Sequence, residues 1–305
     1  MLWRRQTCVG TVQIGIQLAL MILSVHAWKG VQQCKQGSST APHVQPYGGK
    51  IRRAALKRKC VTGDKEFPGI GALSARTIGD GEFETASSAS RRVQDMLSSS
   101  SFRQLLTPMA AAGAILGPNL DNYHSAFGVL TYKNPIKLSI GGSVLVTTDW
   151  WVPPLFAVAG AGIGALYILL DAALETPLEK RQVAWRDVFL CISLFSFQYY
   201  LSGLLVASGS PPWFLVISLL VLAERVYRVF DSTRAGLYVS LATAVLGPLI
   251  ELLLVNGTDL YVYNNADLLG VDSWIPIVYF CGGPAVGNLA RALFQKLLLV
   301  EAEGG

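Results

Sequence analysis

Residues 273–291, SWIPIVYFCGGPAVGNLAR, decide the fold class of this chain of 305 residues. The run is apolar throughout, and its charge, Arg291, stands at the far end. Gly282, Gly283 and Gly287 fall at helical spacing, and small residues at such spacing let a neighbouring backbone approach closely inside a bilayer. We therefore predict a helix in a membrane bundle rather than a helix of a soluble core.

Apolar runs of similar length recur through the C-terminal two thirds of the sequence. They cover 104–130, 152–172, 187–208, 212–230, 236–256 and 274–298, each near the ~20 residues that a bilayer core requires. Pro108, Pro118 and Asp121 interrupt the first run, which allows a broken or re-entrant segment. We predict an all-α polytopic membrane protein, a bundle of six transmembrane helices over 102–305, with both termini on the side where Lys and Arg gather in the loops.

Charge is distributed unevenly along the chain. Only 15% of its residues are charged, against about 25% in an average soluble domain. Residues 1–63 contain ten Lys/Arg and no acid, so the remaining 15 basic and 20 acidic residues leave a net charge of −5. A basic excess confined to the N-terminus does not indicate a nucleic-acid partner. The five cysteines and three histidines lack ligand spacing, so we expect no metal and no cofactor.

The N-terminus has the composition of a targeting sequence. Residues 1–27 combine two arginines, an apolar stretch and a small-x-small end, which is typical of a signal peptide, with a short signal anchor as the alternative. Residues 28–101 form a transit-like basic region followed by a Gly- and Ser-rich segment, interpreted as a disordered linker. This order resembles the presequence of proteins imported into secondary plastids. We predict a plastid (chloroplast) membrane, with the endoplasmic reticulum membrane as the alternative.

Four motifs occur in one order along the chain. They are WWVPP at 150–154, with Asp171 at the end of the helix that follows, FDSTRAG at 230–236, VNG at 255–257, and the run 273–291. They resemble the WWVPP, FDRSRSG, YNG and SWLPCIFFSGG…GN.GR motifs of the Insig (insulin-induced gene protein) family. Each motif alone is weak, but the four together identify the C-terminal part of the chain as similar to that family.

The resemblance implies a compact bundle of six helices without enzymatic activity. Animal Insigs sit in the endoplasmic reticulum membrane, bind oxysterol between helices, retain the sterol-sensing protein SCAP and present HMG-CoA reductase for degradation. We therefore expect two partners, a lipid or sterol-like small molecule and another integral membrane protein. The leader, the segment 117–135 and Glu251, which replaces an amide, set this chain apart from the animal proteins.

Three residues are the candidate ligand-binding set, namely Glu251, Trp151 and Asn256. An ionised Glu251 in the middle of a span costs at least ~2.5–3.5 kcal/mol unless it is paired, protonated or wetted. It therefore lines a ligand pocket, or it is a neutral acid bonded to Ser or Asn on a neighbouring helix. The alternative function is a small membrane transporter or lipid-handling protein that uses Glu251 as a proton or substrate group. Trp151 is also interpreted as an interfacial anchor.

Asp231 and Arg234 are the candidate client-docking residues. The resemblance implies the role of Asp231, which occupies the position of the family's client-binding aspartate. The structural alternatives are that Asp231 caps the fifth helix, because Asp accepts backbone N–H bonds there, or that it pairs with Arg234. The sequence DNYH, with Asp121 and His124 three residues apart, is interpreted as a hydrogen-bonded turn at the end of the first helix rather than as a metal or proton site.

Overall fold

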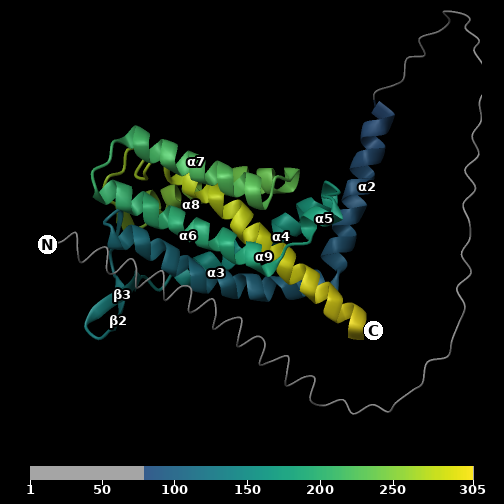
Figure 1. The fold of residues 1–305 in the computed structure, drawn as a ribbon, viewed down its shortest axis with the longest axis horizontal. Coiled ribbons are helices and arrows are strands. Elements are labelled where there is room, and N and C mark those ends of the chain that lie inside the picture. Colours follow the sequence, from purple (N-terminus) through teal and green to yellow (C-terminus); the bar gives the residue numbers. More distant parts are fainter. Residues whose placement is uncertain (1–78, 305) are drawn as a thin grey trace, which may run out of the picture. The chain divides into compact units, whose positions relative to one another are not determined.

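The computed structural model describes residues 79–304 (Figure 1). Its helices are α2 (Gly79–Ser98), α3 (Ser100–Ala126), α4 (Val152–Ala173), α5 (Leu178–Arg181), α6 (Trp185–Ala207), α7 (Pro212–Phe230), α8 (Arg234–Gly257) and α9 (Ile275–Gly304). Its strands are β1 (Leu130–Tyr132), β2 (Ile136–Ile140), β3 (Ser143–Thr148) and β4 (Tyr261–Tyr263). The predicted signal peptide and residues 28–78 of the transit-like region lie outside the described residues.

The helices α3, α4, α6, α7, α8 and α9 form one bundle (Figure 1). The expectation of an all-α fold omitted two small antiparallel sheets at one end of it. One pairs β1 with β4, with Leu130 opposite Tyr263 and Tyr132 opposite Tyr261, so it joins the α3–α4 connection to the α8–α9 connection. The other is the hairpin of β2 and β3. β1 and β4 have three residues each, too few for a period-two pattern to stand out, whereas the sequence IKLSI of β2 does alternate.

The helix α3 is continuous, which corrects the expectation of a broken first segment. It runs through Pro108 and Pro118, and its N-cap is Ser99, whose side chain accepts a hydrogen bond from the backbone N–H of Phe102 at 3.3 Å. A proline inside a helix removes one backbone hydrogen bond. Packing against α4 along most of its length compensates for that loss here, because neighbouring helices support a helix with internal prolines.

Residues 79–98 are helical, not an irregular linker as the Ser- and Gly-rich composition suggests. Arg92 of α2 donates from Nε to the carbonyl of Ala172 at 3.0 Å and from Nη2 to that of Ala173 at 3.1 Å. Its Nη1 also lies 2.7 Å from Oε1 of Glu175. A helix end leaves its last carbonyls without partners, so Arg92 caps α4 and holds α2 against it.

The small residues of the 273–291 run serve close packing, as predicted from their spacing. A Cβ atom on Gly282 would lie 2.9 Å from the Phe195 ring, and one on Gly287 would overlap the ring of Tyr167. A similar contact joins α3 to α4, where a Cβ atom on Gly160 would lie 2.6 Å from the Met109 carbonyl oxygen. Backbones that approach this closely gain van der Waals contact, which drives helix association in membranes.

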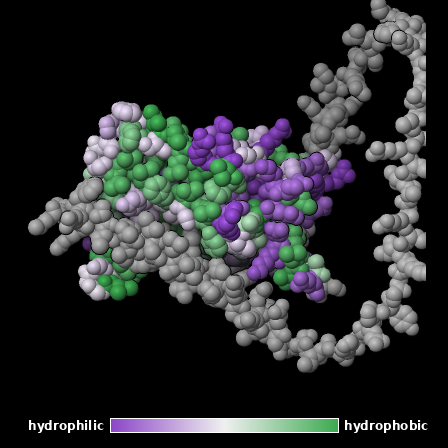
Figure 2. All heavy atoms as spheres, viewed as in Figure 1, coloured by the Kyte–Doolittle hydropathy of each residue, from purple (hydrophilic) through white to green (hydrophobic). Residues whose placement is uncertain are grey.

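The protein is an integral membrane protein. Among the described residues, α4, α6, α8 and the stretch Ile275–Glu303 of α9 are long and apolar enough to cross a membrane. Large apolar side chains such as Val158, Phe197 and Leu253 remain exposed on these helices, and Figure 2 shows hydrophobic residues over much of the bundle and hydrophilic ones gathered toward α5. Charges in α7 and polar residues in α3 lower the hydropathy of these two helices, so the count of six spans stays a prediction.

Candidate functional site

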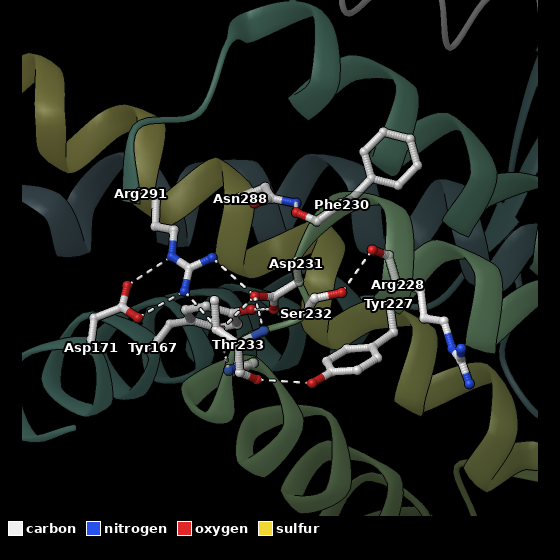
Figure 3. Close-up of polar contacts among 11 residues, drawn as sticks. Tyr167, Asp171, Tyr227, Arg228, Phe230, Asp231, Ser232, Thr233, Asn288 and Arg291 are labelled. Atoms are coloured by element: carbon white, nitrogen blue, oxygen red, sulfur yellow. Dashed lines mark hydrogen bonds and ion pairs between the residues drawn. The ribbon is translucent and has the colours of Figure 1, made fainter. Parts of the chain in front are cut away.

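Arg291 lies at the centre of a buried ionic cluster that joins three parts of the chain (Figure 3). Its Nε donates to Asp171 Oδ2 and its Nη2 donates to Asp171 Oδ1, both at 2.7 Å. This is a bidentate ion pair between α9 and α4. Its Nη1 donates to Asp231 Oδ1 at 3.1 Å, in the connection between α7 and α8. The guanidinium carbon also lies 4.7 Å from the centre of the Tyr167 ring. One cation thereby orders two carboxylates, one from α4 and one from the α7–α8 connection.

Both carboxylate oxygens of Asp231 accept further hydrogen bonds. Tyr167 donates its hydroxyl to Oδ2, and Thr233 donates its hydroxyl to Oδ1 at 2.6 Å. Burial raises the pKa of Asp231, and the charge of Arg291 opposes that rise. A buried charge is tolerated when it is paired and its other lone pairs are bonded, and the cluster around Asp231 meets both conditions.

The α7–α8 connection is held in a strained shape by this cluster. Ser232 has a φ of 57°, in the left-handed region that residues other than glycine rarely adopt. Tyr227 donates its hydroxyl to the carbonyl of Thr233 at 2.9 Å, and Asn288 donates to the carbonyl of Phe230 at 3.0 Å. The connection is therefore tied to both α7 and α9, and Ser232 of the connection and Arg234, the first residue of α8, are exposed.

Both structural alternatives for Asp231 are wrong in detail. The N-cap of α8 is Thr233, whose hydroxyl oxygen accepts from the backbone N–H of Gly236 at 3.0 Å. The ion-pair partner of Asp231 is Arg291 and not Arg234. Arg234 lies three residues after Asp231 but is exposed, whereas Arg291 is a buried residue of α9. The side chain of Asp231 is fully buried, so its carboxylate is not accessible at the surface.

An apolar cavity of about 100 Å³ lies between α3 and α4 on one side and α6, α8 and α9 on the other. Its walls include Leu116, Phe156, Ala159 and Ile163, with Val286 and Leu289 from α9. By the same measure one water needs about 10–15 Å³, so the cavity has room for several. Its lining is almost entirely carbon, which suits an apolar molecule or an acyl chain better than a polar solute.

Glu251 does not line this cavity. It is half-buried, and its carboxylate accepts the hydroxyls of Tyr263 and of Tyr279, the latter at 2.5 Å. Its partners are thus tyrosines rather than the Ser or Asn expected from the sequence. Tyr279 does line the cavity, so Glu251 contacts the cavity lining only through its hydrogen bond with Tyr279. This position favours a supporting role over the path for protons or solutes that the transporter alternative requires.

The other two predicted ligand-binding residues also lie away from the cavity lining. Trp151 is buried against Tyr261, with ring centres 5.3 Å apart and nearly parallel planes. Asn256 is exposed and donates to the carbonyls of Leu252 and Leu269, both at 2.8 Å. Both residues instead hold the connections at the end of the bundle. Trp150, exposed beside Trp151, has the position expected of an interfacial anchor.

The DNYH segment forms the last turns of α3, close to the predicted end of that helix. Asp121 accepts the hydroxyl of Tyr132 in β1. His124 is buried, with Nε2 lying 2.9 Å from Oγ of Ser202 and its ring facing that of Tyr199. Asp121 and His124 therefore have separate partners, and they bind the end of α3 to its neighbours.

Sequence reasoning did not assign Asp171 and Arg291 to a site, although a signal was present. Asp171 is the single charge in the apolar run 152–173, and Arg291 interrupts the last one. An ionisable residue inside a membrane segment is a site candidate by default, with an opposite charge as its expected partner. Pairing these two residues was therefore possible, whereas the additional contact of Arg291 with Asp231 was not.

Comparison of the sequence with known proteins finds one matching family model and several relatives. The family model described as insulin-induced protein (INSIG) matches residues 108–294. Insulin-induced gene 1 protein of Bos taurus is 34% identical over 152 residues, covering 50% of this chain and 53% of that protein. The Danio rerio protein of the same name is 36% identical over 150 residues, covering 49% and 58%. The chain thus spans about half the length of these relatives.

A solved structure is also similar in fold. The mycobacterial Insig homologue MvINS from Mycobacterium vanbaalenii superposes with a TM-score of 0.51 at 20% identity, over 62% of this chain and 94% of that one. This likeness concerns the arrangement of the helices.

Proposed function

Because this chain belongs to the Insig family, we propose that it is a non-enzymatic regulatory membrane protein. It binds a lipid or sterol-like molecule in the cavity between its helices. It also docks another integral membrane protein at the surface formed by Ser232 and Arg234, and the ligand controls that docking. The observation that carries the proposal is that α4 and α9 both line the cavity and both hold the ionic cluster.

In both helices, a residue that lines the cavity lies within one turn of a residue of the ionic cluster. On α4, Ile163 lines the cavity and Tyr167 of the cluster follows one turn later. On α9, Leu289 lines the cavity two residues before Arg291. A ligand that separates α4 from α9 would change the contact between Asp171 and Arg291, and with it the α7–α8 connection. A ligand shifts such an equilibrium only through its different affinity for the two arrangements.

The cavity limits what the ligand can be. Its ~100 Å³ is smaller than the roughly 300–1,000 Å³ of common ligand clefts. We expect it to accept one end of a lipid, such as part of a ring system or an acyl chain, while the rest stays in the bilayer. Entry of a larger part would require α3 and α4 to move away from α9.

Filling the cavity should remove the ligand. Ala159 lines the cavity, so we expect Ala159→Leu to lower the amount of lipid retained on purification by about tenfold, which corresponds to ~1.4 kcal/mol of binding free energy. Mass spectrometry of lipids that copurify with the protein measures this. Ala161→Leu on the same helix, outside the cavity lining, is the matched control. Equal retention by both variants would overturn the ligand site.

The docking surface can be tested in the same membranes. We expect Arg234→Ala to lose crosslinks to its client protein while the protein stays folded, because Arg234 is exposed at the end of α8. Arg225→Ala, which removes an exposed arginine of α7, is the control. Retention of the same crosslinked proteins by the Arg234 variant would contradict docking at this surface.

We also propose that the N-terminal region directs the protein to a plastid membrane, on the basis of its signal-like and acid-free segments. Imaging of a C-terminally tagged protein in the native cell tests this. A plastid pattern is expected, and staining of the endoplasmic reticulum would support the alternative instead.

A further inference from the structure

The hairpin of β2 and β3 exposes a row of large apolar side chains. Ile136, Leu138 and Ile140 alternate along β2 and are 45%, 57% and 72% exposed. Alternate residues of a strand point to the same face. The register shift between Leu138 and Ser139 leaves Leu145 of β3 without a partner and inserts no residue into β2, so these three residues form one apolar face. Lys137 and Ser139, between them, point to the opposite face. Among the described residues, β2 pairs with β3 alone and is exposed along its whole length.

The shape of the hairpin is well defined by its sequence. Gly141 and Gly142 form its turn with φ values of 58° and 80°, as the favoured two-residue turn requires. The register places Leu138 opposite Val146 and Ile136 opposite Thr148, so Val146 extends the same apolar face. A two-stranded hairpin has marginal stability in water unless its apolar face packs against something. The exposed face therefore calls for a covering surface.

The position of the hairpin identifies that surface. β3 ends at Thr148, and α4, a candidate membrane span, begins at Val152. Trp150 between them is 69% exposed, as expected of a tryptophan at the membrane–water interface. Figure 1 shows that the hairpin extends sideways from the ends of the helices instead of continuing their direction. The hairpin thus leaves the bundle at the level of the bilayer surface and runs along it.

We infer that the hairpin of β2 and β3 is a membrane-surface anchor, with Ile136, Leu138 and Ile140 inserted among lipid headgroups and upper acyl chains. Large exposed apolar patches mark interaction sites, and this one lies next in the chain to α4, a candidate membrane span whose Val158 is exposed. The hairpin contains no acidic residue, and Lys137 on its other face would stay in water or near phosphate groups. The anchor would keep the α3–α4 connection against the bilayer whether or not the cavity holds a ligand.

Depth-dependent quenching in membranes tests this inference. The full chain, with Cys8, Cys34 and Cys60 changed to Ser and the buried Cys191 and Cys281 kept, carries an environment-sensitive fluorophore at one new cysteine. Leu138→Cys and Ile140→Cys report the apolar face, and Lys137→Cys and Ser139→Cys report the opposite face of the same strand. The protein is placed in vesicles of phosphatidylcholine and phosphatidylglycerol, with a nitroxide near the top of the acyl chains of some lipids.

We expect several-fold stronger nitroxide quenching and a blue-shifted emission at 138 and 140 compared with 137 and 139. Equal, weak quenching on both faces, with emission typical of water, would overturn the inference. A blue shift at 138 and 140 without lipid quenching, which grows with the density of protein in the vesicles, would also overturn it by showing that a second copy covers the face. The two positions on each face keep the test valid if one variant does not fold. The outcome is independent of ligand binding, so it can fail while the proposed function stands.

Discussion

Replacing Arg291 with methionine should destabilise the protein by about 3–5 kcal/mol, the cost of breaking a buried ion pair on one side. The side chain of Arg291 is 1% exposed, and the two carboxylates that it contacts are equally buried. Without the guanidinium, Asp171 and Asp231 would remain in the interior as unpaired acids. Unfolding of the purified protein in mixed micelles, followed by tryptophan fluorescence, measures the loss of free energy.

Two variants separate the role of the cluster from a general effect of losing an arginine. Arg225→Ala removes an exposed arginine that lies 3.5 Å from Glu224, and a surface pair of this kind contributes about 0–1 kcal/mol. The triple variant Arg291→Met, Asp171→Asn, Asp231→Asn removes all three charges and should recover part of the stability. A loss below ~1 kcal/mol for Arg291→Met would show that the cluster does not hold the helices together.

The second large effect is expected where α3 crosses α4. Gly160→Leu should cost about 1–3 kcal/mol or more, the range for forcing a larger side chain into a packed interior. A Cβ atom at this position already lies 2.6 Å from the carbonyl oxygen of Met109 and 3.1 Å from Cα of Gly113, and backbone atoms cannot rotate away. The helices would have to separate, so the cavity beside them would change shape as well. The same micelle unfolding measurement, together with retained lipid, detects both results.

Gly162 supplies the matched control, because it lies on the same helix with nothing within 4 Å of its Cβ position. Gly162→Leu should leave the stability of the bundle almost unchanged, since the added side chain points away from it. Leucine favours a helix more than glycine does, so equal destabilisation by the two substitutions would show that the contact with α3 does not explain the loss.

Several features of the fold followed from local sequence. The positions of the helices were predictable because a bilayer requires ~20 apolar residues in a row with every backbone group bonded internally. The close packing at Gly283 was predictable because small residues let a neighbouring backbone approach, and a Cβ atom there would lie 2.8 Å from Cα of Ser240. Gly282 and Gly287 instead make room for the aromatic rings of Phe195 and Tyr167. The prolines of α3 misled the prediction, because support from a neighbouring helix is not written in the segment itself.

The hydropathy pattern and the small-residue spacing by themselves determined that this chain forms a helical membrane bundle, because the bilayer acts on each segment separately. Its likeness to the Insig family rested on the order of four sequence motifs. The tertiary structure alone decided which charges meet. Arg291 lies 120 residues from Asp171 and 60 from Asp231, and no spacing along the chain states which helix ends adjoin. The tertiary structure also placed the candidate ligand site in the apolar cavity lined by Tyr279, not at Glu251, which contacts Tyr279 from outside the lining. Such a cavity forms only where several helices leave space between them.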